Sequence, residues 1–445
     1  MSVNETLGMI MLFGMVAVIF IGFPISFTLL FLALFFGGVG LGWQQTFDLA
    51  YLQIWGTMKD EILPAVPLFI FMGYMTEQAG LMERLFLALR NLLAPVRGAL
   101  YLAVILTATI FAMATGIVGA AVTVLGIMAG PIMIKTGYDA RLSAGAIAAG
   151  GTLGILIPPS VMLVVMGPTM GVPVNLLYSA TLGPGFLLAG MYMVYCLVRS
   201  FINPALGPPV PVEERVSNYW LVIKEFAIGV LPLACLIGFT LGTILGGLAT
   251  PTEAASCGAF GATLLALVYR KLTFTALKNA GVSTMVTSSM VLLLAVASNV
   301  FGAVFTKLGA AALITNTLVG LPWPDVWKLA LVMVLIFILG WPFEWPAIVL
   351  VFLPIFLPVV EKLQLGLSKL DMLIWFGTLV AVNLQTAFLS PPVAMSAYYL
   401  RNVVPQWSLS TIYRGMADYM VIQVICLAAL FMWPEIALWL VRALR

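Results

Sequence analysis

The chain has few charged residues for its length. Asp, Glu, Lys and Arg together make up 8% of its 445 residues, whereas soluble domains usually contain about 25%. Hydrophobic residues make up 62%, and the mean hydropathy is +1.13. A soluble fold needs many polar residues to cover its outside, so this composition predicts a polytopic protein of the lipid bilayer.

Histidine is absent, which excludes catalysis, metal binding and proton transfer by that side chain. The four cysteines are scattered without a CxxC pair, which favours apolar packing over a metal or disulfide role. The net charge is only +3, and no basic tract points to nucleic acid. Because the chain also lacks a P-loop, a Rossmann fingerprint and a GxSxG motif, an ion gradient is the obvious energy source for any transport.

A membrane-spanning helix needs about 20 apolar residues. The start of the chain has no cationic region, so residues 7–21 are expected to form a retained first helix and not a cleaved signal peptide. Residues 83–97 are amphipathic and are expected to lie along the membrane interface. We expect helices at 6–21, 24–42, 64–82, 142–166, 178–199, 226–246, 252–269, 283–304, 373–397 and 417–441.

Two apolar stretches, 98–134 and 329–361, are about 35 residues each, which is too long for one span and fits two short helices. Helix-breaking residues lie near the middle of each: Thr115-Gly116 in the first, and Gly340 to Pro346 in the second. We therefore predict two re-entrant hairpins. Their unwound tips must be buried in protein or line a wet cavity.

Basic residues orient this arrangement. With both hairpins re-entrant, 13 of the 20 Lys and Arg residues fall on one side of the membrane and seven on the other. The positive-inside rule puts the richer side in the cytoplasm, which predicts that both termini lie outside.

The order of helix, hairpin and broken helix occurs twice. Pro158-Pro159 and Pro391-Pro392 each interrupt a helix that follows a hairpin. Since the hairpins open to opposite sides, we predict inverted repeats. Inverted repeats with discontinuous helices are typical of secondary transporters, and the broken ends mark the binding site.

Pairing each tip with a break gives two candidate sites. Unwound carbonyl oxygens suit Na⁺, and helix N-termini suit a carboxylate. The first candidate site comprises Thr115, Gly116, Thr152, Pro158, Pro159 and Ser160. The second comprises Glu344, Asn383, Gln385, Thr386, Ser390, Pro391 and Pro392. Na⁺ is the expected coupling ion, held mainly by backbone carbonyls, and no other metal or cofactor is expected.

Each of these candidates has a structural alternative. Gly116 can serve close helix packing, and Glu344, which is costly in an apolar run, can form an ion pair instead of binding a cation. Glu253 is a further candidate, but capping of its helix by Thr250 or Thr252 explains it as well.

Two other polar features are expected to be structural. Glu77 lies near Arg84 and is expected at an interface. Tyr398 and Tyr399 are expected to anchor the chain at the membrane surface.

Three separated motifs point to one family: Gly126 to Ser160, Thr250-Pro251-Thr252-Glu253-Ala254-Ala255, and Asn383-Leu384-Gln385 followed by Pro391-Pro392-Val393. They resemble the large (M, DctM-like) membrane subunit of tripartite ATP-independent periplasmic (TRAP) transporters, over almost the whole chain and in order. The resemblance implies an elevator-type fold of the ion-transporter superfamily and Na⁺-coupled import of a small organic acid. It also implies two partners, a small four-helix (Q) membrane subunit and a soluble periplasmic binding protein, in a bacterial or archaeal inner membrane.

With this resemblance the chain divides into scaffold and transport parts. The expected divisions are 1–97 (N-terminal scaffold helices and arm), 98–199 (first half of the transport domain), 200–225 (cytoplasmic linker), 226–328 (second half of the scaffold), 329–416 (second half of the transport domain) and 417–445 (C-terminal helix).

Both tips depart from the usual pattern of the family. The first reads Thr115-Gly116-Ile117-Val118 where relatives commonly have Ser-Gly-Ser-Ser, so ligation there is expected to rest on the backbone. The second has Glu344 where many relatives have Asp, and this variant resembles a branch that includes carriers of 2-oxo and 2-hydroxy acids. A monocarboxylate is therefore expected over sialic acid or a C4-dicarboxylate.

Two rival functions differ in kind from this one. An autonomous ion-coupled anion carrier would need no binding protein. An intramembrane enzyme would need a catalytic constellation, and the sequence shows no paired Asp or Ser-Lys arrangement to supply it. We therefore expect no enzyme activity.

Overall fold

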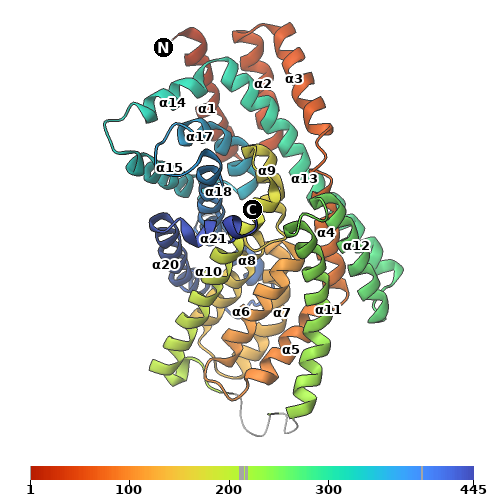
Figure 1. The fold of residues 1–445 in the computed structure, drawn as a ribbon. Helices are drawn as coiled ribbons and strands as arrows, with labels where there is room; N and C mark the ends of the chain where they lie inside the picture. The colour runs from red at the N-terminus through yellow and green to blue at the C-terminus, as the bar shows by residue number, and fades with distance from the viewer. Residues whose placement is uncertain (1, 210–214, 216–218, 392–393) are drawn as a thin grey trace.

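The computed structural model describes residues 2–209, 215, 219–391 and 394–445 (Figure 1). All regular secondary structure in these ranges is helical, which confirms the all-α class. A break at 157–160 bends α8 (Ala140–Leu156) from α9 (Val161–Met170) by 42°, and the pair gives one further candidate span. Eight described helices are long and apolar enough to cross a membrane, one of them together with the 3-10 turn that extends it to Phe388: α1 (Val3–Ile21), α7 (Val118–Lys135), α10 (Val174–Ile202), α11 (Tyr219–Leu245), α12 (Pro251–Val268), α13 (Phe274–Lys307), α18 (Lys369–Gln385, with the turn) and α20 (Leu409–Met432).

Each half of the chain begins with a group of helices that ends in a short helix. In the first half, α1 is followed by α2 (Ile25–Gly40), α3 (Trp43–Met58), α4 (Ala65–Gln78) and the short amphipathic α5 (Leu81–Leu93). In the second half, α11 and α12 are followed by the long α13 and the short α14 (Ala310–Val319). Across the halves, α2 packs on α13, and α12 packs on α4.

A helix-break-helix unit follows in each half, where we predicted the hairpins. In the first, α6 (Ala99–Thr115) and α7 are separated by Gly116-Ile117. In the second, α15 (Asp325–Leu339) is separated by residues 340–344 from a continuous path of α16 (Trp345–Ala347), the π-helical η3 (Ile348–Phe352) and α17 (Leu353–Val360). The breaks lie where the sequence placed them. Re-entry from one membrane face stays a prediction.

The base of the second unit is held by one carboxylate. Asp325, the first residue of α15, accepts the backbone N–H of Gln364 at 2.9 Å and pairs with Lys328 at 3.1 Å. These two donors, the Gln364 N–H first, hold the pKa of Asp325 below its usual range. These contacts join the start of α15 to the residues that follow α17, and so connect the two ends of the second helix-break-helix unit.

Each unit is followed by an interrupted helix and a long helix. In the first half these are α8, α9 and α10. In the second half, α18 is followed by the 3-10 turn η4 (Thr386–Phe388), α19 (Met395–Val403) and α20. The halves interlock, because α10 packs on α18 and α20 packs on α8. Likewise α9 contacts η3 and α17, and α19 contacts α7.

Small residues permit the closest of these crossings, between α8 and α20. A Cβ on Gly145 would lie 2.7 Å from the carbonyl oxygen of Gly415, and a Cβ on Gly415 would lie 2.1 Å from that of Arg141. Such a crossing is typical of membrane helices, whose backbones approach where side chains are small. It fixes the interrupted helix of one half against the long helix of the other.

The structure differs from the sequence prediction in three elements, of which the short α14 lies outside every predicted helix. α3 was not expected, because Gln44, Gln45 and Asp48 interrupt its apolar run. The single helix expected at 417–441 is two, since α20 ends at Met432 and α21 (Glu435–Ala443) begins after Pro434, which lacks a backbone donor. α21 turns back to pack on α10 and on α18.

Candidate functional site

Both predicted tips open onto one cavity, which we call the tip cavity. Its volume is about 420 Å³. One wall comes from α4 and α13, and the other comes from the two tips with residues of α8, α9 and α19. Its described lining is Ile70, Tyr74, Glu77, Gly116, Ile117, Val118, Gly119, Ala120, Thr123, Ile155, Val161, Val286, Thr287, Met290, Val291, Glu344, Trp345, Pro346, Phe388 and Tyr399.

The first tip brings backbone close to backbone. Gly116 has a φ of +60°, a conformation that side chains disfavour, and a Cβ there would lie 3.4 Å from the backbone nitrogen of Val161. The break after α8 therefore lies directly against this tip, as the pairing of tip and break predicted. A residue with a side chain at position 116 would be strained and would also press on the start of α9.

The helices that start at this junction lack side-chain caps. Ile117 and Ser160 are the N-cap residues of α7 and α9, and neither side chain accepts a hydrogen bond from the helix that follows. The first N–H groups of such helices have no intrahelical partner, and the helix dipole is positive there. Val118, Gly119 and Val161 line the tip cavity, so this region suits an anionic group.

The second tip adds a carboxylate. Glu344 is the N-cap of α16, but its side chain makes no capping bond. It is half-buried and lines the tip cavity with Trp345 and Pro346. Among the described residues, no hydrogen bond or ion pair is formed by its side chain, so the ion-pair alternative for Glu344 finds no partner here.

A second carboxylate faces the same space. Glu77 of α4 is half-buried and, within the described part of the chain, has no hydrogen-bonding or ionic partner. No Lys or Arg belongs to the described lining of the tip cavity. Next to Glu77, the hydroxyls of Tyr74 and Thr287 lie 3.1 Å apart and join α4 to α13. Two partly buried carboxylates without a cation favour a cavity that takes up positive charge.

Four of the predicted hydroxyl residues are buried and donate to nearby backbone carbonyl oxygens. Thr152 donates to the carbonyl oxygen of Ala149 at 2.8 Å, and Ser160 donates to that of Ile155 at 2.5 Å. Thr386 and Ser390 bond in the same way, each at 2.7 Å, to the carbonyl oxygens three and four residues earlier. None of these hydroxyls lines the tip cavity.

The predicted amides lie at the end of α18 and are fully buried. Asn383 donates through Nδ2 to the carbonyl oxygen of Met333 at 2.8 Å, whereas its Oδ1 has no protein partner. Neither amide atom of Gln385 has one. Buried polar atoms are nearly always paired, so these atoms mark a place where a water molecule or an ion is expected.

The remaining candidates divide by location. Pro158 and Pro159, joined by a cis peptide bond, are buried in the break between α8 and α9, and Pro391 is exposed. Pro392 and the side chain of Thr115 lie outside what the structure describes. A ligand role for the residues of either predicted site stays a prediction.

Glu253 lies outside the tip cavity. It forms a capping box with Thr250, whose backbone N–H donates to the Glu253 carboxylate at 2.8 Å while Glu253 N–H donates to the Thr250 hydroxyl at 3.3 Å. Both residues are exposed. The capping explanation therefore accounts for this carboxylate.

Sequence reasoning did not assign to the site several polar residues that line the tip cavity. Tyr74, Glu77, Thr287 and Tyr399 all line it, although Glu77 and Tyr399 were expected at interfaces. The argument that singled out Glu344, a carboxylate in a long apolar run, applies equally to Glu77 within residues 64–82. That signal was present in the sequence.

Comparison with known proteins gives one consistent family. The family described as "Tripartite ATP-independent periplasmic transporter, DctM component" matches residues 12–436. The sialic acid TRAP transporter large permease protein SiaM of Vibrio cholerae is 28% identical over 438 residues, 96% of each chain. The C4-dicarboxylate TRAP transporter large permease protein DctM of Pseudomonas aeruginosa is 29% identical, over 87% of this chain and 88% of that one.

A longer relative and a solved structure extend the comparison. The isethionate TRAP transporter permease protein DctMQ of Oleidesulfovibrio alaskensis is 30% identical over 76% of this chain and 52% of its own length. The crystal structure of the Alcanivorax borkumensis YdaH transporter superposes with a TM-score of 0.63 over 88% of this chain and 89% of that one, at 17% identity. At that identity the likeness shows a shared fold.

Proposed function

Because the chain belongs to the DctM family of large permease subunits of TRAP transporters, we propose that it imports a small organic acid together with Na⁺. Members of this family are membrane transport proteins, not enzymes, and they work with binding proteins and a small membrane subunit. The family places this multi-span chain in a bacterial inner membrane. The coupling ion, the substrate class and the orientation are our proposals.

The tip cavity is the observation that carries the proposal. An acid needs donors and positive dipole ends, which the uncapped starts of α7 and α9 supply. A cation needs oxygen ligands, and Glu77 and Glu344 supply two carboxylates without partners. An anionic substrate would be repelled by two bare carboxylates, so Na⁺ must enter with it or before it. The cavity thereby couples the two fluxes.

The placement of the cavity supports an elevator mechanism. Its fixed wall is formed by α4 and α13, and its other wall by the interlocked hairpins and interrupted helices. We propose that the second group moves across the membrane against the first, with both termini in the periplasm. The polar linker at 200–225 would join the halves in the cytoplasm.

The substrate proposal is a 2-oxo acid, a 2-hydroxy acid or another small carboxylate. Relatives carry names for substrates as different as sialic acid, C4-dicarboxylates and isethionate, all of them acids. The lining offers few side-chain donors beyond Tyr74, Thr287 and Tyr399. A small monoanion held by backbone N–H groups suits this sparse set.

The test is uptake into proteoliposomes that contain this chain and its small subunit. Labelled pyruvate, lactate and succinate are supplied under an inward Na⁺ gradient, with and without the binding protein. We expect uptake that needs both Na⁺ and the binding protein. Uptake that ignores the binding protein would favour an autonomous carrier, and uptake that ignores Na⁺ would overturn the coupling proposal.

Two variants test the site itself. Glu344→Ala and Gly116→Leu should abolish uptake while the protein still inserts and purifies. Glu83→Ala, which removes an exposed carboxylate away from the tip cavity, serves as the matched control and should transport normally. Uptake at the unmodified rate by either site variant would show that the tips do not bind the substrate.

A further inference from the structure

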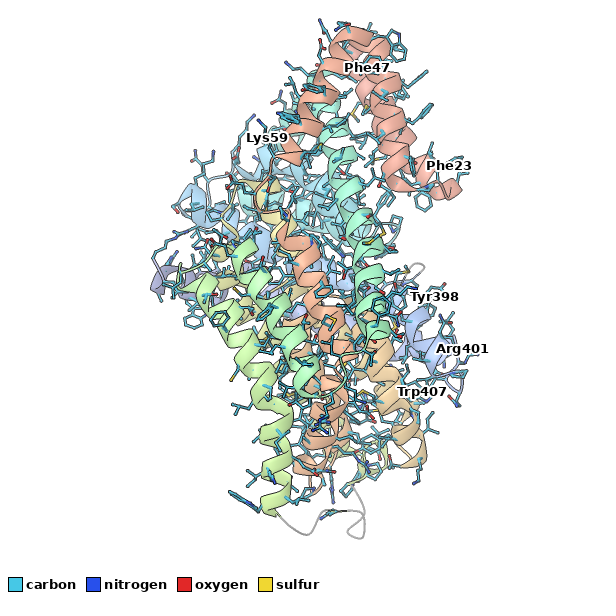
Figure 2. The ribbon with its side chains drawn as sticks, turned by 90° about the vertical axis from the view of Figure 1, so that its right-hand side faces the viewer. Phe23, Phe47, Lys59, Tyr398, Arg401 and Trp407 are labelled. Atoms are coloured by element: carbon cyan, nitrogen blue, oxygen red, sulfur yellow. The ribbon has the colours of Figure 1, made fainter. Side chains whose placement is uncertain are left out.

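A second, smaller pocket lies further along α13, where α3 and the residues that follow it take the place of α4. Its volume is about 170 Å³, and we call it the upper pocket. Figure 2 shows Lys59, at the end of α3 beside this pocket, well above Tyr398 of α19, the neighbour of the cavity-lining Tyr399. The described residues that line the upper pocket are Gln53, Gly56, Thr57, Asp60, Leu63, Val165, Pro168, Thr169, Ala295, Asn299 and Leu350.

The scaffold is built alike at the two cavities. At the tip cavity, a hydrogen bond of 3.1 Å joins Tyr74 to Thr287 of α13. At the upper pocket, Asn299 of α13 donates to the Thr57 hydroxyl at 2.8 Å. Thr287 and Asn299 are twelve residues apart, which is roughly 18 Å along a helix that rises about 1.5 Å per residue.

The row of α13 residues that joins these two polar points is apolar. Val291 and Ala295, which continue the same i to i+4 row, are both buried. α13 therefore presents two polar positions separated by an apolar interval. Polar groups at both ends of such a row in a membrane helix need a reason, since each costs free energy in an apolar setting.

The opposite wall of the upper pocket belongs to the proposed moving group. α9 runs from Val161, which lines the tip cavity, to Thr169, which lines the upper pocket. Leu350 of η3 completes that wall. In this conformation the tips face Thr287, and the segments just beyond them face Asn299.

We propose that the upper pocket is the scaffold half of the outward-facing binding site, where the tips receive the acid. This inference rests on the proposed elevator function. When the tips move along α13 toward Asn299, the amides of Gln53 and Asn299 replace Tyr74 and Thr287 as the scaffold donors to the carboxylate. Thr57 holds Asn299 in position through its hydrogen bond.

The charges around the upper pocket suit a site that binds the acid and Na⁺ only briefly. Asp60 is the acid in its lining, and its Oδ1 accepts the backbone N–H groups of Ile62 and Leu63 at 2.8 and 3.1 Å. Lys59 lies over the ring of Trp55 at 4.8 Å. Asp60, the neighbouring Lys59 and the amides of Gln53 and Asn299 can bind a carboxylate and its Na⁺ weakly enough for both to be released.

Cross-linking in proteoliposomes tests the proposal directly. In a chain without its native cysteines (C196A/C235S/C257S/C426A), Ala120→Cys is combined with Thr287→Cys or with Asn299→Cys, and a short bifunctional thiol reagent is added. Ala120 lines the tip cavity, so the pair with position 287 should cross-link in this conformation. The pair with position 299 should cross-link only with Na⁺ and loaded binding protein outside.

The matched control pair is Ala120→Cys with Ser289→Cys. Ser289 is an exposed residue of α13 that lies outside the lining of both cavities, so this pair should not cross-link in either state. If the cysteine-free chain shows Na⁺-dependent uptake but positions 120 and 299 never cross-link, the proposed outward-facing binding site is wrong while the transporter function stands. If uptake itself is absent, the proposed function fails first.

A kinetic variant gives an independent readout. Asn299→Leu removes one hydrogen-bond donor to the acid and should raise the apparent KM for the loaded binding protein at least about tenfold. A tenfold change corresponds to a free energy of about 1.4 kcal/mol. Thr287→Val should instead slow release inside and lower kcat. Ser289→Ala is the control. If the Asn299 and Thr287 variants changed KM and kcat equally, the assignment of separate outward-facing and inward-facing binding positions would be wrong.

Discussion

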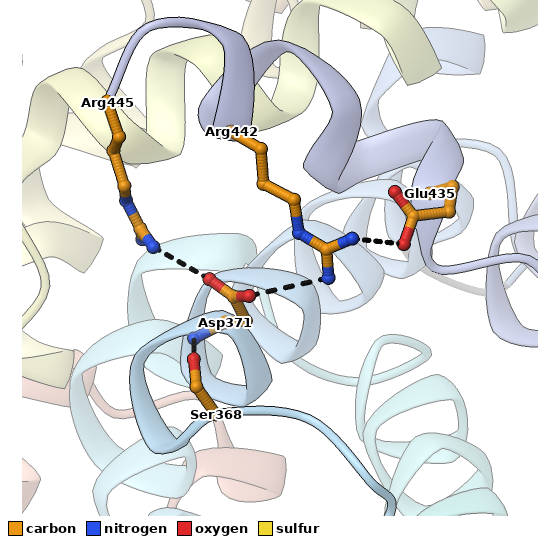
Figure 3. Close-up of polar contacts among 5 residues, drawn as sticks. All are labelled: Ser368, Asp371, Glu435, Arg442 and Arg445. Atoms are coloured by element: carbon orange, nitrogen blue, oxygen red, sulfur yellow. Dashed lines mark hydrogen bonds and ion pairs between the residues drawn. The ribbon is translucent and has the colours of Figure 1, made fainter.

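The C-terminal helix is fastened to the start of α18 by one carboxylate between two arginines (Figure 3). Asp371, in the first turn of α18, pairs with Arg445 at 2.8 Å and with Arg442 at 3.4 Å. Arg442 also pairs with Glu435 of α21. The other end of α18 carries Asn383 and leads into the second break. We predict that removing both arginines by R442A/R445A destabilises the protein measurably.

The burial of the carboxylate sets the size of the effect. The side chain of Asp371 is 11% exposed, whereas those of Arg442 and Arg445 are 44% and 33% exposed. Stripping the partners from a fully buried charge costs about 3–5 kcal/mol. Because the arginines are partly in water and the positive end of α18 still faces Asp371, we expect about 1–3 kcal/mol.

The assay is the thermal unfolding midpoint of the purified protein in detergent, supported by uptake after brief heating. R442A/R445A should lower the midpoint by several degrees. Adding D371N should restore most of the loss, because a neutral amide no longer needs a cation. Lys307→Ala, which removes an exposed cation without an ion pair among the described residues, is the control. An unchanged midpoint in R442A/R445A would refute the reasoning, and so would a loss that D371N does not relieve.

Three further substitutions test a helix crossing, an ion pair and a helix cap. Gly415→Ala should lower the yield of folded protein and cost at least about 1–3 kcal/mol, because its Cβ would meet the Arg141 carbonyl oxygen; Gly281→Ala, which meets nothing within 4 Å, is the control. Asp325→Asn should lower the unfolding midpoint at pH 7. The difference should be complete above about pH 4 and should be lost as the pH falls further, through the depressed pKa of folded Asp325, because the stabilisation comes from the ionised form. Glu253→Gln should leave uptake unchanged, and a large loss of uptake would return it to the candidate site.

Hydrophobic pattern and helix breakers were enough to predict the frame of the molecule. The runs 98–134 and 329–361 are too long for one helix, and the structure breaks them at Gly116-Ile117 and at residues 340–344. The Pro-Pro pairs likewise predicted where α8 and α18 are interrupted. These signals are local, because a breaker acts on the helix that contains it.

Pairings between distant segments were harder to predict. Glu77 and Glu344 are 267 positions apart in the sequence, and only the packing of the tips against α4 and α13 brings both to one cavity. The hydroxyls of Thr152, Ser160, Thr386 and Ser390 do not line this cavity, for a local reason. Ser and Thr in membrane helices bond back to carbonyl oxygens of their own turn, as Thr152 and Ser390 do here.

The two unpaired carboxylates also explain why the proposed carrier would not leak. In the proposed movement from the level of Thr287 to that of Asn299, the tips would pass the buried apolar residues Val291 and Ala295. With Glu77 remaining on the scaffold, the moving tip takes Glu344 with it. A bare carboxylate on this path is costly, and so is a carboxylate accompanied only by a second anion, whereas Na⁺ bound with the acid lowers the cost. Under the proposed mechanism, movement of the tip with the acid alone would therefore be disfavoured, and Na⁺ coupling would follow from the charge of the cavity and the apolar residues along the path.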